Sequence, residues 1–329
     1  GISRQRAKKL FPGRWRHRLV INLGMVSDDT DHAAFVAQSL LVYPHSSGLF
    51  AKRLSWCLRW WLLSLPASVG FATLRSILCL WLGVSRAHSG VYSAGNGAAM
   101  RSAPIGAFFA NWPDQIDEYV EASTRLTHAD PRALTGAKAV AYLTAWSIRD
   151  RLVERPELDG LLKLLRRAGN SNEEWTTMVR SMATAYHQRL SVEQFAQSLG
   201  LRAGVTGYVY HTVPVAVYAW YRHFGCFEDT LSAVFDCGGD TDTVGAIAGA
   251  LAGAVVGEQG IPGDWLNGIH DWPRGIGVLR AIADRLAEKS QPPEAGSPVT
   301  YFWPGVVPRN IFFLLVVILH GFRRLAPPY

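Results

Sequence analysis

The chain has 329 residues, 49% of them hydrophobic and 18% charged, which is enough for one large or two small domains with a core. This composition excludes a disordered tail, and 31 Gly and 17 Pro exclude collagen-like and low-complexity classes. Residues 1–26 account for the net charge of +7, because they hold seven basic residues and no acid, whereas the remainder holds 26 of each sign. The basic charge therefore describes one segment, and we expect no nucleic-acid partner.

Apolar residues recur at helical spacing along most of the chain, and the alternation of a half-buried strand is almost absent. The sequence therefore predicts an all-α fold. No linker is evident before residues 291–298, which predicts a single domain over 1–329, with a basic N-terminal segment (1–26) and a C-terminal extension (299–329). The predicted helices cover residues 27–43, 52–63, 68–82, 114–126, 131–148, two or three stretches of 149–197, then 208–224, 227–235 and 243–256.

Two apolar stretches need interpretation. Trp56, Trp60 and Trp61 fall in a predicted helix, and we expect them in the core or at helix contacts, because aromatic burial dominates packing energetics. The most hydrophobic stretch, 311–319, is too short to span a bilayer, which needs about 20 apolar residues. We expect a buried terminal helix there, with a helix resting on a membrane surface as the alternative. No signal peptide is visible, so we expect a cytoplasmic protein, and we expect no transmembrane segment. We also expect a monomer.

Residues 27–32 read Ser-Asp-Asp-Thr-Asp-His and stand at the predicted start of a helix. A capping Asp is ordinary there and stabilises a helix by about 1 kcal/mol. Three acids in four residues exceed what capping needs, because adjacent carboxylates repel one another unless a cation offsets their charge. The segment alone leaves capping and a divalent-metal site equally open.

Residues 238–243 read Gly-Gly-Asp-Thr-Asp-Thr, a glycine turn that brings Asp240, Asp242 and the Thr243 hydroxyl to the start of another helix. That helix has glycine at every fourth position from 245 to 257, and we expect its bare face to let another backbone approach closely. If the two acidic segments converge, four or five carboxylates surround one point, which demands about two divalent ions. Oxygen ligands favour Mg²⁺, Mn²⁺ or Ca²⁺ over zinc.

Residues 95–101 read Gly-Asn-Gly-Ala-Ala-Met-Arg, so small residues precede a helix and backbone N–H groups could face an anion. A simple loop with a helix cap explains the same pattern. His128 also has two explanations: taken alone, a core histidine is favoured, whereas its Thr-His-Ala-Asp-Pro context favours contact with a substrate.

Taken together, these segments resemble the ADP-ribosylglycohydrolase family of DraG-like hydrolases, which remove ADP-ribose. The resemblance covers nearly the whole chain and rests on the order and spacing of five segments: 27–30, 95–106, 126–131, 207–214 and 238–243. Members of this family have an all-helical fold that holds two Mg²⁺ or Mn²⁺ ions at its centre. The implied activity is metal-dependent cleavage of the glycosidic bond between ADP-ribose and a modified protein side chain or a small conjugate.

The resemblance also implies a set of site residues. The implied metal ligands are Ser27, Asp28, Asp29, Asp240, Asp242 and Thr243, of which Asp28, Asp29 and Asp240 are the implied catalytic residues. The glycine segment would receive the diphosphate, and neighbouring residues would contact the rest of the substrate. The implied substrate contacts are Gly95, Asn96, Gly97, His128 and, on the adenine side, Tyr208.

The sequence departs from the family pattern in three places. Members usually begin with a glycine-rich helix containing Gly-Asp-Ala, followed by a glutamate that reaches the metal centre; this chain contains neither, and we expect that element to have been removed or lost. The alternative function is therefore an ADP-ribose-binding protein with weak or no turnover. Residues 91–94 lack the acid that some arginine-specific relatives carry, so the linkage is open. Asp31 and His32 replace a frequent Gln-Met pair, which bears on substrate preference.

Overall fold

The computed structural model describes residues 13–20, 23–67, 69–169 and 172–323. In these ranges the regular structure is helical, and extended pairing is limited to isolated bridges. The predicted all-α fold is thus confirmed. The helices are α2 (Asp28–Val42), α3 (Ser47–Leu63), α4 (Phe71–Trp81), η1 (Ala99–Arg101), α5 (Ala103–Phe108), η2 (Pro113–Gln115), α6 (Ile116–Arg125), α7 (Pro131–Arg149), α8 (Leu158–Gly169), α9 (Glu173–His187), α10 (Val192–Ser198), α11 (Val209–Arg222), α12 (Phe227–Cys237), α13 (Thr241–Val256), η3 (Glu258–Gly260), α14 (Gly263–Asn267), α15 (Ile276–Glu288), η4 (Trp303–Gly305) and α16 (Val306–Arg323).

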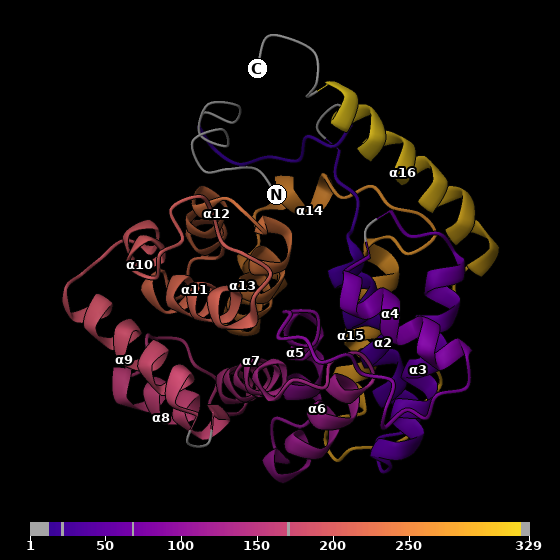
Figure 1. Ribbon diagram of the computed structural model, residues 1–329, viewed down its shortest axis with the longest axis horizontal. Coiled ribbons are helices and arrows are strands. Elements are labelled where there is room, and N and C mark those ends of the chain that lie inside the picture. The colour runs from indigo at the N-terminus through magenta and orange to yellow at the C-terminus, as the bar shows by residue number, and fades with distance from the viewer. Residues whose placement is uncertain (1–12, 21–22, 68, 170–171, 324–329) are drawn as a thin grey trace.

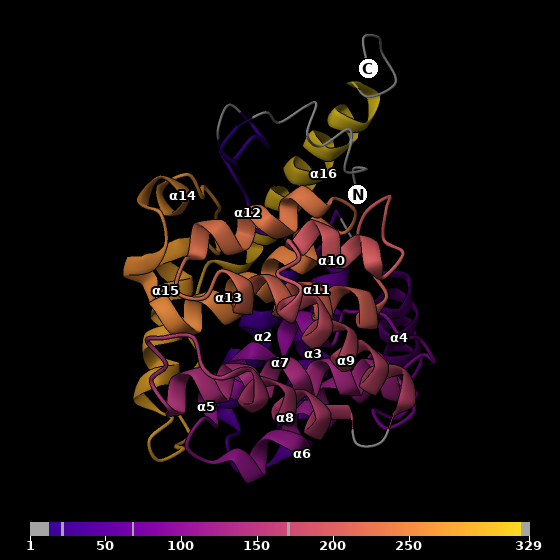
Figure 2. The same ribbon diagram turned by 90° about the vertical axis from the view of Figure 1, so that its left-hand side faces the viewer.

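Helix α7 lies at the centre of the fold. It starts with Pro131, and the side chain of the preceding Asp130 accepts a hydrogen bond from the backbone N–H of Arg132. Small buried residues cover most of its surface, so α5, α6, α8, α11 and α13 all pack against it. In Figure 1, helices α10 to α13 lie on one side of α7 and α2 to α4 on the other, and Figure 2 shows the same body turned. This arrangement brings the start of α2 toward the start of α13.

The glycines of α13 have a different role from the one predicted. Their helix packs mainly on α12, and a Cβ at Gly245 would meet the ring of Phe235, while a Cβ at Gly253 would meet nothing within 4 Å. Side chains, and not another backbone, meet this face at Gly245 and Gly249, and the face is open at Gly253. The close backbone approach occurs between α5 and α7, where a Cβ at Gly106 would lie 2.1 Å from the carbonyl oxygen of Ala141.

One prediction about apolar residues holds in part and another was wrong. Trp61 is buried, and Trp56 and Trp60 make helix contacts with the ring of Trp81 in α4, but neither is in the core, since 45% and 47% of their area is exposed. The terminal helix is not buried either, since α16 runs along the edge of the body in Figure 1 and extends beyond it in Figure 2. Helical spacing identifies an apolar stripe but does not say whether another element of the same chain covers it.

Candidate active site

The first acidic segment forms the N-terminus of α2. Ser27 occupies the N-cap position without capping the helix through its side chain; its hydroxyl donates to Asp29 Oδ2 at 2.8 Å instead. Asp29 is buried, and its Oδ1 has no hydrogen-bond partner among the described residues. Because a buried carboxylate oxygen is costly to leave unpaired, this atom indicates that another group completes the site.

A glycine turn sets the position of the second acidic segment. Gly238 and Gly239 have φ angles of 69° and 85°, in the left-handed region that favours glycine. The turn is pinned to Val205, whose N–H donates to the Gly238 carbonyl and whose carbonyl accepts from the N–H of Asp240 at 2.8 Å. A Cβ at Gly239 would lie only 2.0 Å from the carbonyl oxygen of Val205, so glycine is required there. Asp240 therefore begins α13 with its carboxylate at a fixed place.

Asn96 connects the glycine segment to this turn. Its Nδ2 donates to Asp240 Oδ2 at 2.6 Å and to Thr212 Oγ1 at 3.0 Å, and its backbone N–H donates to the Gly207 carbonyl. These three bonds orient the Asn96 side chain. Asn96 thereby holds the Asp240 carboxylate, a positioning contact that the sequence did not suggest.

His128 lies against the other side of the glycine segment. Its ring nitrogen Nε2 would be 3.1 Å from a Cβ at Gly95, so the ring packs directly on the glycine backbone. Its Nδ1 lies 2.8 Å from Thr127 Oγ1, which accepts a hydrogen bond from the buried guanidinium of Arg101. With that lone pair used, the Thr127 hydroxyl can donate to Nδ1, and we assign the ring proton to Nε2 on the glycine side. Burial lowers the pKa of His128 to about 3, so the ring is neutral near pH 7.

These elements enclose a polar cavity of about 350 Å³. Eight of the predicted site residues line it, namely Asp28, Gly95, Asn96, Gly97, His128, Asp240, Asp242 and Thr243. Asp29 is not among the lining residues, and Tyr208 joins the site only through backbone pairing with Gly95 while its hydroxyl bonds Glu174. The sequence analysis missed Gly70, Phe71, Ala72 and Thr73, which line the cavity from the start of α4. Nothing in that apolar helix signals a site.

The carboxylates in this region repel one another. Burial, followed by the charges of Asp29 and Asp242, raises the pKa of Asp28 to about 7. Burial and Asp242 likewise raise the pKa of Asp29 to about 6, although hydrogen bonds from Ser27 and Thr243 oppose the shift. The pKa of Asp240 is also raised, by burial and by its neighbour Asp242. The two acidic segments, more than 200 residues apart in sequence, therefore share one electrostatic environment.

Divalent cations fit the chemistry of this donor set. Across the described ranges, no three His, Cys, Asp or Glu side chains are already arranged around an ion position. The unpaired Asp29 oxygen and the mutually repelling carboxylates are nevertheless what a hard cation would satisfy, and the donors are all oxygens.

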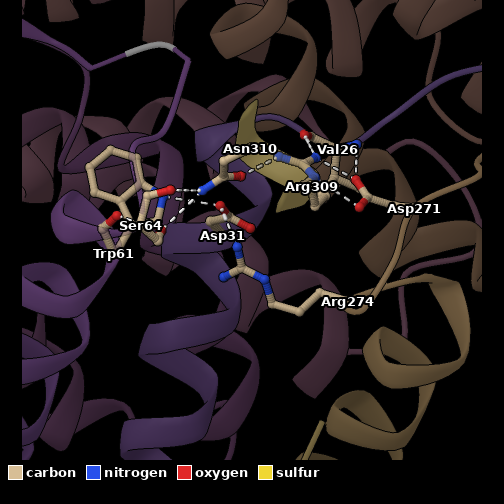
Figure 3. A network of polar contacts seen from close by, with 8 residues as sticks. All are labelled: Val26, Asp31, Trp61, Ser64, Asp271, Arg274, Arg309 and Asn310. Atoms are coloured by element: carbon tan, nitrogen blue, oxygen red, sulfur yellow. Dashed lines mark hydrogen bonds and ion pairs between the residues drawn. The ribbon is translucent and has the colours of Figure 1, made fainter. Parts of the chain in front are cut away.

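Asp31, the third acid of the first segment, points away from the cavity. It pairs with Arg274 at 2.9 Å and accepts a hydrogen bond from Trp61 Nε1 at 3.0 Å (Figure 3). The adjacent His32 is fully buried against Trp61, and neither ring nitrogen has a partner among the described residues. Both side chains therefore belong to the core behind α2, and neither lines the cavity.

Similarity to known proteins places the chain in a family. Residues 1–296 match the family model described as ADP-ribosylglycohydrolase. The chain belongs to the ADP-ribosylglycohydrolase family. This membership confirms the resemblance inferred from the five segments, and α16 lies beyond the matched residues.

Similar proteins cover most of this ADP-ribosylglycohydrolase-family chain. An uncharacterized protein of Archaeoglobus fulgidus is 32% identical over 273 residues, 82% of each chain. The ADP-ribosyl-[dinitrogen reductase] glycohydrolase of Rhodospirillum rubrum is 26% identical over 84% of this chain and 85% of its own, and human ADP-ribosylhydrolase ARH3 is 27% identical over 61% of each. A solved ADP-ribosylglycohydrolase-related protein complex superposes with a TM-score of 0.61, at 29% identity over 81% of this chain and 82% of that one.

Proposed function

We propose that the protein is a Mg²⁺- or Mn²⁺-dependent ADP-ribosyl hydrolase, which cleaves ADP-ribose from a modified protein side chain or a small conjugate. One observation carries this proposal: Asp28 from α2, and Asp240 and Asp242 from the start of α13, line one polar cavity with the glycine segment. Family membership supports the reaction class, because the Rhodospirillum rubrum relative is named for this reaction on dinitrogen reductase.

The metal ions would be held by the six oxygen donors named above, as is typical of this family. When bound, Mg²⁺ or Mn²⁺ supplies a Lewis acid beside the adjacent hydroxyls of the ribose. The protein supplies the orientation: Asn96 fixes the Asp240 carboxylate through the 2.6 Å hydrogen bond, and Ser27 fixes Asp29. A deprotonated carboxylate in this cluster is placed to take a proton from the attacking water as the bond at C1′ breaks.

The glycine segment and His128 provide the remaining contacts. Glycines at 95 and 97 leave the backbone open to the cavity, which suits the close approach of a diphosphate. His128, neutral and carrying its proton on Nε2, offers a hydrogen-bond donor without adding charge beside the metal ligands. Arg101 holds both parts in place, since it donates to the carbonyl of Gly97 and to the hydroxyl of Thr127.

Release of ADP-ribose from arginine- and serine-linked peptides tests the proposal. With Mg²⁺ or Mn²⁺ the native protein should release ADP-ribose, and chelation with EDTA should abolish release. Asp240→Asn should lower the rate at least a hundredfold, because it removes an anionic donor from the centre of the cluster. Asp159→Asn, at an exposed position of α8, is the matched control and should retain full activity.

Calorimetry with ADP-ribose separates turnover from binding. Equal release without metal, or by Asp240→Asn, would contradict a metal-dependent hydrolase. Tight binding of ADP-ribose without release from either peptide would instead support the alternative, a binding protein of the same fold.

A further inference from the structure

Helix α16 exposes a fully apolar outer face. Its inner residues, such as Val306, Asn310 and Val316, are buried against the body, whereas the exposed residues between 306 and 322 are all apolar. The outer residues are between 43% and 65% exposed: Ile311, Phe312, Leu315, Ile318, Leu319 and Phe322. A surface helix ordinarily turns polar residues outward, so α16 has the reverse orientation.

Buried polar contacts fix the base of α16 to the body. Arg309 pairs with the buried carboxylate of Asp271 and donates to the carbonyl of Val26, and Asn310 donates to Ser64 Oγ and O at 3.0 and 2.8 Å (Figure 3). These groups are costly to separate because each would leave a buried polar partner unpaired. The orientation of the outer face is therefore set by the fold.

The apolar surface continues from α16 across α3 and α4. The ring centroid of Trp303, just before α16, lies 5.9 Å from that of Trp60 in α3. The ring centroid of Trp81 in α4 lies 6.2 Å from that of Trp60 and 6.2 Å from that of Trp56. All four rings are partly exposed, and Leu78 and Leu82 of the α4 region are exposed beside them. We call α16's outer face, these tryptophans and the exposed residues of α4 the apolar face. Exposed tryptophans of this kind are typical of membrane–water interfaces.

The segments that form the apolar face also lack acidic residues. Residues 1–27, 32–113 and 295–329 contain sixteen Lys and Arg and no Asp or Glu, whereas the rest of the chain holds 17 basic and all 26 acidic residues. The acid-free segments include α3, α4 and α16. Exposed cations among them are Arg16, Lys52, Arg75 and Arg86, and residues 15–19 lie along the end of α16, where His320 Nε2 is 2.8 Å from the Leu19 carbonyl.

We propose that the apolar face binds the surface of an anionic lipid bilayer, with α16 lying in the headgroup region of one leaflet. Apolar side chains would enter the acyl boundary, and the surrounding cations would contact anionic headgroups. A second copy of the chain fits poorly, because a two-fold contact would place the same basic surface against itself.

A membrane-spanning arrangement fits poorly as well. Residues 303–322 form the one helical stretch in the described residues that is long and apolar enough to cross a bilayer. Crossing would pull Arg309 and Asn310 out of their buried contacts and into hydrocarbon, where such groups are expensive. The in-plane arrangement keeps both, and it is independent of the hydrolase activity.

Co-sedimentation of the full chain with vesicles tests this proposal. Binding to phosphatidylcholine vesicles containing phosphatidylserine should exceed binding to phosphatidylcholine alone at least tenfold, and should fall as salt is raised. Leu315→Gln with Leu319→Gln should lower the partition coefficient at least tenfold without changing the melting temperature, because both side chains are exposed. Val153→Gln, at an exposed apolar position elsewhere, is the matched control and should bind as the native chain does.

Three results would overturn the proposal. Equal binding to both vesicle types, or none, would remove the anionic bilayer as the occupant. A native dimer in light scattering that the double variant converts to a monomer would identify a second copy instead. Resistance of the vesicle-bound protein to alkaline carbonate would indicate a spanning helix, whereas the in-plane arrangement predicts release. If the double variant misfolds, the salt dependence and lipid dependence of binding by the native chain still test the proposal.

Discussion

The burial of the His32 side chain costs folding free energy. Its ring is fully buried, packs at 4.5 Å on Trp61, and has two nitrogens without partners among the described residues. Burial, together with the charges of Arg101 and Arg274, lowers its pKa well below the ordinary value. The folded protein therefore keeps this ring neutral at pH values where the unfolded chain protonates it.

This difference predicts a pH-dependent stability. Below about pH 6.5 the unfolded state binds one proton more than the folded state at this position, so stability is lost as the pH falls, by about 2 kcal/mol between pH 6.5 and 5. His32→Leu should remove that part of the slope in urea unfolding measured from pH 7 to 5. His45→Leu, at an exposed position, is the control; an unchanged slope in His32→Leu would refute the assignment.

At the scale of elements, the packing of α5 on α7 depends on one missing side chain. Gly106 brings the two backbones together, as the 2.1 Å approach of its notional Cβ to the Ala141 carbonyl shows. Gly253 of α13 has open space at the corresponding atom. The two glycines look alike in sequence, and only the structure distinguishes them.

Alanine substitutions should therefore have opposite effects. Gly106→Ala should lower the free energy of unfolding by about 3 kcal/mol, because α5 must move away from α7. Gly253→Ala should raise it by up to about 1 kcal/mol, because alanine is the better helix former. Urea denaturation measures both, and a neutral Gly106→Ala would show that the interface relaxes freely.

The sequence predicted most elements because helical periodicity is local: the predicted helix over 131–148 agrees with α7, and that over 227–235 with α12. The acidic segments and the glycine segment were also identifiable, since their residue types are unusual at helix starts. Long-range packing was not predictable. The implied ligand set left Asp31 out, but its pairing with Arg274 could not be read from the sequence, and Phe71 gave no sign of lining a cavity.

At the scale of the whole molecule, the fold brings carboxylates from two distant parts of the chain close together, at a cost in electrostatic free energy. Burial, and after it the charges of neighbouring carboxylates, raises the pKa of Asp28 and of Asp240, so ionised carboxylates are unfavourable at the junction of α2 and α13 when no metal is bound. The catalytic function proposed above and metal-free stability therefore oppose each other at this junction.

Divalent ions should consequently stabilise the fold. At a hundredfold excess over the dissociation constant, Mn²⁺ or Mg²⁺ should add about 2.7 kcal/mol, a rise of several degrees in the melting temperature. Asp240→Asn should melt higher than the native chain in EDTA and gain little from metal. Differential scanning fluorimetry with and without metal provides the comparison; a native melting temperature indifferent to both ions would argue against the site.

Phe71 connects the apolar face with the cavity. Its side chain is 73% exposed at the start of α4, on the apolar face, and it also lines the cavity that holds Asp28 and Asp240. A protein seated on a bilayer through that face holds its cavity at the edge of the lipid. Under the two proposals made above, the search for modified partners would take place in two dimensions. Turnover would then depend on how many substrates occupy a given area of membrane, and dilution of the surrounding solution would leave it unchanged.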